Sequence, residues 1–373
     1  MFALVAAAFA NIYVTQPVLP LIEREFDATT ASTAWTVSAV LLGIALANLP
    51  FGWLSDRVSV RILIAIGAAA IAAAGLVCAT TARLDVLIAA RFAQGACVPA
   101  LTTCLAAYLA RNLPFARLNV VMGSYVAATV LGGMFGRLLG GWVHPAEAWR
   151  HGFISAALLV VLAAVAALAI LPRANATPAR PAVVVGYRQL LGRSEVWLSC
   201  LCGAAGQAVF SPVFNYMPYR LGEPLFGYST AETTLLYLVY LVGIVMGPGA
   251  GRLANRYGSG ATLMAGAATL AAALLVLMLP SALAIAVGLI GVCAGFFTLH
   301  AAAVGALNRK LSAGLGRANA LYVLAYYLGA WFGVTWAGHA YQYGGWRFML
   351  MLALILVTLP FLAGLHERRT ALA

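Results

Sequence analysis

The chain has 373 residues; 64% of them are hydrophobic, 9% are charged, and the formal net charge is +12. A soluble domain carries about 25% charged residues, so this composition excludes an ordinary soluble enzyme and leaves no length for a separate soluble catalytic domain. The basic residues lie in short loops between apolar runs, which argues against a nucleic-acid partner despite the positive charge.

Twelve apolar segments follow one another along the chain. About 20 apolar residues are needed for each crossing of a bilayer, so twelve helices with short loops fill the chain almost completely. The first segment is expected to span the membrane, because no small-residue cleavage site of a signal peptide ends it. We therefore predict an all-α membrane protein with twelve transmembrane helices. The expected spans are residues 2–22, 31–54, 61–80, 86–109, 118–141, 151–171, 197–219, 231–250, 260–280, 283–307, 318–340 and 347–365.

Basic residues are distributed unevenly over the loops. With a cytoplasmic N-terminus, fifteen of them fall on the inner side and five on the outer side, whereas Arg91 and Arg137 lie within predicted helices. A threefold excess in short loops is the positive-inside pattern. We therefore expect a multi-pass protein of the cell inner membrane with both termini in the cytoplasm.

The second half of the chain repeats the landmarks of the first at a shift of about 197–201 residues. The segment at 52–57, Gly-Trp-Leu-Ser-Asp-Arg, recurs at 251–256 as Gly-Arg-Leu-Ala-Asn-Arg, and the Trp-Arg pair at 149–150 recurs at 346–347. Parallel repeats in a membrane protein typically enclose a substrate path between them. The repeat thus favours the movement of a solute over chemistry on one.

Residues 172–196 are the longest stretch that does not span the membrane, and they are enriched in Pro and Arg, which suits a linker. The predicted domains are a six-helix bundle at 1–171, a cytoplasmic linker at 172–196 and a second six-helix bundle at 197–373. The six cysteines fall inside predicted helices, and no histidine stands at metal-ligand spacing from them. We therefore expect neither a disulfide, a metal nor another cofactor.

Three motifs resemble the signatures of the major facilitator superfamily. The loop signature is Gly52-x-Leu54-x-Asp56-Arg57 followed by Arg61; the fourth-helix signature is Arg91-x-x-Gln94-Gly95; the fifth-helix signature, associated with antiporters, is Gly132-x-x-x-Gly136-x-x-x-Gly140-Gly141. Tyr13-x-x-Gln16-Pro17 in the first helix, together with Arg137, is closest to the acriflavine-sensitivity branch of the 12-helix drug/proton antiporters. The resemblance implies two pseudo-symmetric six-helix bundles that work by alternating access.

The sequence departs from the family pattern at two positions. Ser59 replaces the usual glycine of the loop signature, and Asn255 replaces the acid of its second copy. Only the first copy of the loop therefore keeps its full set of charges.

Gly52, Asp56, Arg57 and Arg61 are the gating candidates. Gly52 is expected to allow close approach of a neighbouring helix, and Asp56 to pair with Arg57 or Arg61, or to lie at the N-terminus of the eleventh helix, where a negative charge is favoured. The resemblance implies that this loop latches the two halves on the cytoplasmic side. The alternative is a solvated charge cluster that only fixes topology.

Arg91 lies within the fourth helix, where an unpaired charge costs at least about 2.5 kcal/mol toward the membrane centre. It must face the protein interior or extend to the outer surface, and the resemblance implies an interior residue that takes part in coupling. Asp85 and His300 are the other coupling candidates, because histidine titrates near neutrality and Asp85 precedes Arg91 on the same helix. For Arg137, extension to the surface and a functional role both stay open.

Four glycines of the fifth helix, Gly132, Gly136, Gly140 and Gly141, are the hinge candidates. Their four-residue spacing forms one flat face that permits close contact with a partner helix. The functional interpretation is a pliable hinge that seals the protein while the halves rock; the alternative is tight packing alone. Gly329, Gly333 and Gly338 repeat the pattern and are expected to occupy equivalent positions.

A substrate cavity is expected between transmembrane helices 1, 4, 7 and 10, which occupy equivalent positions in the repeat. A polar side chain in a bilayer has to find a partner, so it marks an interior face more often than a lipid-facing one. Such a wall, largely uncharged and rich in aromatic groups, with one cation, suits a hydrophobic or amphipathic ligand. The cavity candidates are Asn11, Gln16, Gln94, Gln207, Asn215, Tyr237, Tyr240, His300, Tyr322, Tyr326 and Trp331.

Three functions are compatible with the sequence to different degrees. The first is proton-coupled efflux of small amphipathic compounds by a monomeric secondary transporter; the second is an exporter or facilitator of a sugar or other polar metabolite without tight proton coupling. The third, a membrane-embedded enzyme or scaffold, is disfavoured because no nucleophile–base pair or metal constellation is visible. Ten acids are present, and none lies clearly at mid-membrane. Proton coupling therefore follows from the resemblance more than from the residues.

Overall fold

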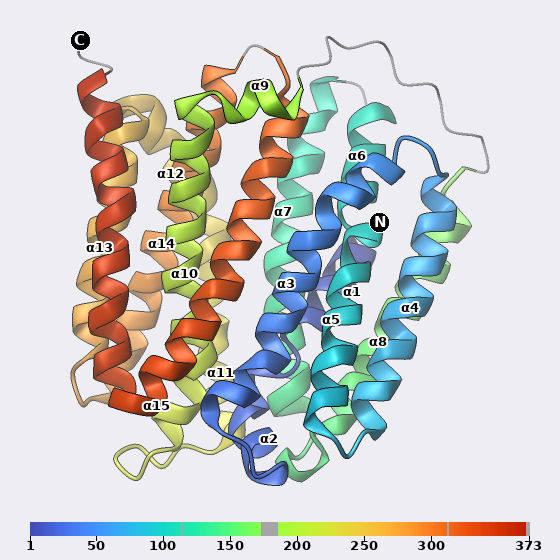
Figure 1. The fold of residues 1–373 in the computed structure, drawn as a ribbon, viewed down its shortest axis with the longest axis vertical. Coiled ribbons are helices and arrows are strands. Elements are labelled where there is room, and N and C mark those ends of the chain that lie inside the picture. Colours follow the sequence, from blue (N-terminus) through green and yellow to red (C-terminus); the bar gives the residue numbers. More distant parts are fainter. Residues whose placement is uncertain (113–114, 173–185, 312, 371–373) are drawn as a thin grey trace. The chain divides into compact units, whose positions relative to one another are not determined.

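The structure is a computed structural model, and it describes residues 1–112, 115–172, 186–311 and 313–370 (Figure 1). Within these ranges the chain is built of helices joined by short connections. Most of the expected linker, residues 173–185, lies outside the described residues; its last part contains the short helix α9 (Tyr187–Leu191).

The described helices include eleven that are long and apolar enough to cross a membrane. The last of them, α15 (Leu315–Thr370), has 56 residues, which would extend over roughly 80 Å as one straight helix, far more than a bilayer core. Gly345 interrupts it with φ 67° and ψ −166°, a conformation that favours glycine, so two spans lie on either side. The count of twelve transmembrane helices is therefore consistent with the structure.

The chain divides into two compact units. The first unit comprises Met1–Arg180 and Tyr228–Tyr237; the second comprises Pro181–Gly227 and Leu238–Ala373.

In the first unit, the first transmembrane helix is broken. It consists of α1 (Phe2–Tyr13), the 3-10 segment η1 (Gln16–Val18) and α2 (Leu19–Glu25). Pro17 and Pro20 at the starts of the last two pieces lack the N–H that a continuous helix requires. The other elements are α3 (Thr30–Leu54), α4 (Val60–Thr80), α5 (Leu84–Leu101), α6 (Thr103–Asn112), α7 (Phe115–Leu138), the π-helical turn η2 (Leu139–Val143), η3 (Ala146–Ala148), α8 (Arg150–Ile170) and α11 (Thr230–Leu235).

The second unit has long, largely continuous helices around a core of small and aromatic residues. The 3-10 segment η4 (Leu236–Tyr240) joins α11 of the first unit to α12 of the second. The elements of the second unit are α9, α10 (Ser194–Gly222), α12 (Leu241–Tyr257), α13 (Ser259–Leu277), α14 (Ala282–Lys310) and α15.

The sequence repeat corresponds to the same packing of two helices in each unit. In the first unit, a Cβ added to Gly132 or Gly136 of α7 would collide with the backbone of Ala6 or Ala10 in α1. In the second unit, Gly329 and Gly333 of α15 meet the backbone of Ala204 and Ala208 in α10 in the same way. Both units therefore contain the same glycine-mediated contact between helices at equivalent positions of the repeat.

The arginine of the repeated Trp-Arg pair has the same role in both units. Arg150 Nη2 donates to the carbonyl oxygen of Thr81 at 2.9 Å, and Arg347 Nε donates to that of Met278 at 3.2 Å. Each acceptor is the residue that directly follows a long helix, α4 or α13. The arginine thus neutralises the negative end of a helix dipole at the same place in each repeat.

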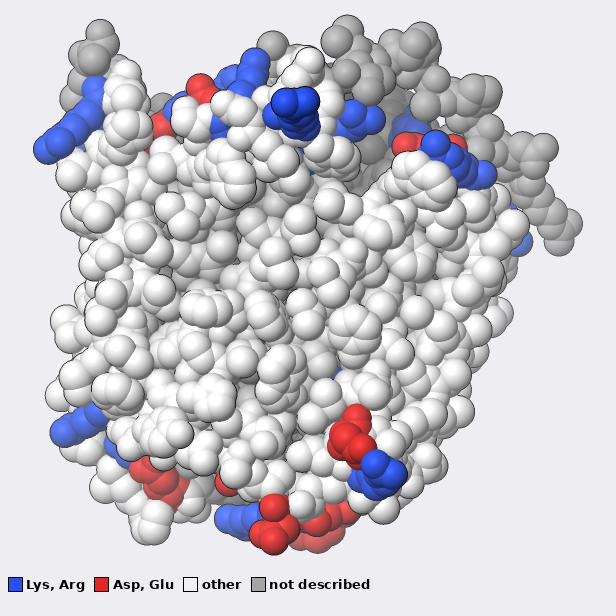
Figure 2. All heavy atoms as spheres, viewed as in Figure 1, with Lys and Arg blue, Asp and Glu red and all other residues white. Residues whose placement is uncertain are grey.

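Charged side chains gather near the helix ends. Figure 2 shows Lys, Arg, Asp and Glu at two opposite ends of the helices, with a surface between them that is almost free of charge. In the first unit, Arg61 contacts the C-terminal end of α8, whereas Arg150, paired with Glu25, stands at its N-terminal end. This distribution is the one expected of a protein whose helices cross a bilayer.

Candidate functional site

Arg91 is completely buried at the break of the first transmembrane helix. Its Nη1 donates to the carbonyl oxygen of Asn11 at 2.7 Å and its Nη2 donates to that of Ile12. These two carbonyls belong to the last turn of α1, where the backbone acceptors lack partners within the helix. The guanidinium therefore caps a helix C-terminus inside the protein, where the helix dipole favours a positive charge.

Two further contacts fix Arg91 among the helices of the first unit. Nε donates to the carbonyl oxygen of Thr36 in α3 at 2.9 Å, and Nη1 donates to Gln94 Oε1 on its own helix at 2.7 Å. Extension to the outer surface is therefore wrong for Arg91. Asp85, the acidic coupling candidate on the same helix, has an exposed side chain that pairs with Arg83 at 2.5 Å.

Gln94 and Asn11 complete a polar cluster around Arg91. Gln94 Nε2 donates to the carbonyl oxygen of Ile71 in α4 at 3.2 Å. Asn11 Nδ2 donates to Ala7 on its own helix at 2.9 Å and to Ala156 in α8 at 3.0 Å. Both cavity candidates are 1% exposed and bonded within the first unit. They face the interior, as polar residues of a membrane helix should, and they bridge helices.

Arg137 is the second buried arginine, with 2% of its surface exposed, so it does not extend to the surface either. It lies in the last turn of α7, and its Nε donates to Gln16 Oε1 at 2.7 Å, while Nη1 donates to the carbonyl oxygen of Gly133 at 2.7 Å. Its guanidinium carbon lies 3.9 Å from the ring centre of Tyr13 and 5.3 Å from that of Tyr237. The cavity candidates Gln16 and Tyr237 thus both contact the guanidinium of Arg137.

The hinge candidates of helix 5 face the broken first helix. A Cβ on Gly140 would collide with the carbonyl oxygen of Val14, which directly follows α1. This contact continues the row formed by Gly132 and Gly136. Gly141 approaches Pro17 and the hydroxyl of Thr234 in α11. Gly140 and Gly141 both lie in the π-helical turn η2, an irregularity that the sequence analysis did not predict.

The loop signature is built differently from the expectation. Asp56 pairs with Arg111 at 2.6 Å, not with Arg57 or Arg61. Arg61 Nη1 donates to the carbonyl oxygen of Leu168 at 2.5 Å and to that of Leu171, so it caps the end of α8. Arg111 comes from α6, 55 residues after Asp56, and could not be identified from the loop itself.

The other two gating candidates make few contacts. Arg57 stacks over the ring of Trp53, with 3.8 Å between its guanidinium carbon and the ring centre. Contrary to expectation, no described atom lies within 4 Å of the position that a Cβ on Gly52 would occupy. Asp56 itself keeps 59% of its side chain exposed. The loop thus presents an accessible carboxylate.

An aromatic cluster surrounds His300 in the second unit. His300 Nδ1 and the hydroxyl of Tyr322 form a hydrogen bond of 2.7 Å. The imidazole stacks on Phe296 with 5.8 Å between ring centres, and Phe296 stacks on Phe210 with 4.0 Å. Tyr326 lies 5.1 Å from His300 between ring centres.

The remaining cavity candidates also belong to the second unit. Tyr240 packs on Phe210 and Phe214, at 5.5 and 4.6 Å between ring centres. Gln207 and Asn215 are buried in α10, and Trp331 is half-buried in α15. The structure thus places Tyr240, Tyr322 and Tyr326 in one aromatic cluster with His300.

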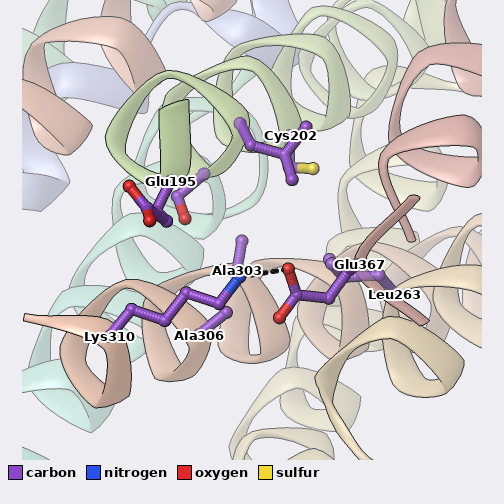
Figure 3. A pocket seen from close by; sticks show the side chains of 9 residues that line it. Glu195, Cys202, Leu263, Ala303, Ala306, Lys310 and Glu367 are labelled. Atoms are coloured by element: carbon purple, nitrogen blue, oxygen red, sulfur yellow. Dashed lines mark hydrogen bonds and ion pairs between the residues drawn. The ribbon is translucent and has the colours of Figure 1, made fainter. Parts of the chain in front are cut away.

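A small pocket, missed by the sequence analysis, lies inside the second unit. Its polar residues are Glu195, Ser199, Lys310 and Glu367 (Figure 3). Lys310 of α14 forms an ion pair with Glu367 of α15, and Glu367 is only 8% exposed. Glu367 stands in a charged terminal segment, directly before Arg368 and Arg369.

Comparison with known proteins identifies the family. Residues 1–311 match the Major Facilitator Superfamily. The chain belongs to the major facilitator superfamily. The resemblance inferred from the three signatures is thereby confirmed.

Individual members of the superfamily support the same assignment. The inner membrane transport protein YnfM of Escherichia coli is 26% identical over 374 residues, which cover 99% of this chain and 90% of that protein. A multidrug resistance protein B homolog of Mycobacterium tuberculosis is 32% identical over 172 residues, which cover 45% of this chain and 32% of that protein. The match to the superfamily and to the transport protein YnfM confirms a transporter and not an enzyme.

A solved structure of the superfamily has the same fold. The crystal structure of a bacterial homolog to the human lysosomal transporter Spinster, in an inward-facing and unoccupied conformation, aligns with a TM-score of 0.80. The alignment covers 99% of this chain and 96% of that one at 15% identity. The predicted major facilitator fold, an all-helical multi-pass membrane protein, is therefore confirmed.

Proposed function

We propose that this major facilitator transporter exports small amphipathic compounds by alternating access, driven by the proton gradient. The observation that carries the proposal is the content of its interior: a cation held by an amide and two tyrosine rings in the first unit, and an aromatic cluster around His300 in the second. Such surfaces suit ligands that combine a planar apolar body with a polar group.

The multidrug resistance relative supports efflux as the direction of transport, although it matches only part of this chain. The excess of basic residues on one side of the predicted topology supports an orientation with both termini in the cytoplasm. The protein then acts in the inner membrane as a monomer of two six-helix bundles, residues 1–171 and 197–373, joined by the linker at 172–196.

Within this proposal the signature residues have separate roles. Asp56, exposed beside Arg111, is the accessible carboxylate of the cytoplasmic latch. Gly132, Gly136, Gly140 and Gly141 let helix 5 move against the broken first helix without opening a leak. Arg91 keeps the break of the first helix in shape, and His300 is the candidate that exchanges a proton.

Purified protein reconstituted in proteoliposomes tests the proposal. Accumulation of an amphipathic aromatic probe is measured with and without an imposed pH gradient, with protein-free liposomes as the control for passive diffusion. A gradient that drives uptake in inside-out vesicles, and is dissipated faster when the probe is present, is the expected result. Flux that is equal with and without the gradient would favour the facilitator of a polar metabolite, and sugars and amino acids would then be tested in its place.

A further inference from the structure

The short helix α9 packs against the ends of two membrane spans in the second unit. It directly precedes α10, and Figure 1 shows it lying across the end of that helix. Leu190 of α9 is completely buried, and the guanidinium carbon of Arg317, in the first turn of α15, lies 5.3 Å from the ring centre of Tyr187. Because α10 and α15 each begin a membrane span here, α9 lies at the boundary between bilayer and water.

The surface of α9 changes from apolar to basic around the helix. With about 100° between successive side chains, their order around the helix is Leu190, Tyr187, Leu191 and Arg188. Leu190 is buried and the other three are exposed. Apolar and basic groups therefore stand side by side, as they do in helices that lie in the interfacial layer of a membrane.

Trp197, in the first turn of α10, extends the apolar part of this surface. Its indole Nε1 donates to the carbonyl oxygen of Leu191 at 2.6 Å, so the ring lies beside the end of α9. Trp197 is 58% exposed and Leu191 is 42% exposed. Tryptophan at the end of a membrane span is typical of the layer in which lipid headgroups meet the acyl chains.

Two arginines flank these apolar groups. Arg188 lies on α9, and Arg193 directly precedes α10. Both are exposed, and neither side chain forms an ion pair or a hydrogen bond with another residue that the structure describes. A guanidinium can donate two parallel hydrogen bonds to the oxygens of a phosphate group. The surface thus combines cations for a phosphate with apolar groups for the chain attached to it.

We propose that α9 and the start of α10 form a binding site for an anionic phospholipid of the surrounding membrane. Arg188 and Arg193 contact the phosphodiester, while Leu191 and Trp197 lie against the glycerol and the upper part of an acyl chain. A zwitterionic lipid has the same phosphodiester, but its ammonium group cancels the charge that the arginines attract. With the proposed topology the lipid belongs to the cytoplasmic leaflet and fastens the last part of the linker to the membrane. The site does not depend on which substrate is carried.

Quenching of Trp197 by brominated lipids tests the site. The purified full-length chain is reconstituted in bilayers of equal parts phosphatidylglycerol and phosphatidylcholine, with bromine on the acyl chains of one lipid or of the other. The contribution of Trp197 is the difference between each protein and the same protein with Trp197→Phe. One basic residue favours an anionic lipid about fivefold. Phosphatidylglycerol should therefore occupy the place beside Trp197 in the wild type roughly tenfold more often than phosphatidylcholine, or more.

Three double variants separate the site from the total charge of the protein. Arg188→Gln with Arg193→Gln should be quenched equally by the two lipids. Arg252→Gln with Arg256→Gln removes the same charge from α12; it is the matched control and should keep the wild-type preference. Arg188→Lys with Arg193→Lys should keep a weaker preference, because an ammonium cannot reproduce the planar fork of the guanidinium.

Three results would overturn the assignment. The first is equal quenching by the two lipids in the wild type, a comparison that needs no change of the arginines. The second is an unchanged preference in the variant with both glutamines. The third is loss of the preference when inorganic phosphate is added at constant ionic strength, because the arginines would then bind a soluble anion and not a lipid.

Discussion

A matched pair of glycine substitutions in α7 isolates the close contact between helices 1 and 5. Gly132→Ala places a methyl group against three backbone atoms of Ala6, each closer than 3.0 Å, and backbone cannot yield by a rotation of a side chain. Gly123→Ala adds the same group on the same helix with no described atom within 4 Å. Both changes gain the same helix propensity, about 1 kcal/mol.

The difference between the two variants is therefore the collision alone. Overpacking of a tight contact costs roughly 1–3 kcal/mol. We expect Gly123→Ala to be as stable as the wild type or slightly more so, and Gly132→Ala to be less stable than Gly123→Ala by roughly 1–3 kcal/mol. Gly329→Ala, the repeat counterpart that meets the backbone of Ala204, should behave like Gly132→Ala.

Unfolding of the purified variants in one detergent, followed by tryptophan fluorescence, measures this difference. Transport activity of Gly132→Ala should fall as well, because the altered contact lies beside the hinge. Equal unfolding transitions for Gly132→Ala and Gly123→Ala would refute the close contact between α7 and α1, and with it the interpretation of the glycine pattern as a packing face.

Three further outcomes are expected. Asp56→Asn should lower transport but leave stability nearly unchanged, because an ion pair this exposed contributes at most about 1 kcal/mol. Asn255→Ala should lower transport less. If the cysteines on the inner side are as accessible in Asp56→Asn as in the wild type, the latch is contradicted. Arg91→Ala should reduce gradient-driven transport more than ligand binding. It should also destabilise the fold, because each buried carbonyl left unpaired costs about 1–3 kcal/mol. A stable, fully active variant would show that the C-terminus of α1 does not need the arginine cap. His300→Gln should flatten the dependence of transport on pH if the imidazole carries the proton. An unchanged pH profile would remove His300 from the coupling path.

The fold could be predicted because hydropathy and the repeat are properties of the whole chain. Long apolar runs of membrane length leave few alternatives, and glycines at four-residue spacing predicted a packing face that the structure contains in both units. The interruptions within the helices were harder to predict from the sequence. Pro17 and Pro20 marked the interruption of the first helix, whereas nothing in the sequence marked the π-helical turn at Gly140 and Gly141.

The partners of the charged residues could not be predicted, because they are distant in sequence or belong to the backbone. Arg91 donates to carbonyls of α1 and α3, which have no side-chain signature. Asp56 finds Arg111 on another helix, and Glu367 is buried although it stands in a charged terminal segment. Sequence patterns identify which residues are unusual in a membrane; only the packing of helices decides what satisfies them.

Counterflow in proteoliposomes tests the central claim, that this chain is a carrier, most directly. Vesicles preloaded with unlabelled probe are diluted into a trace of the labelled probe, with no pH gradient and no membrane potential. Alternating access predicts a transient accumulation of label above its external concentration, since each inward step is matched by an outward step with unlabelled probe. Label that only equilibrates, at a rate that preloading does not change, for every anionic, neutral and cationic probe tried, would contradict the account.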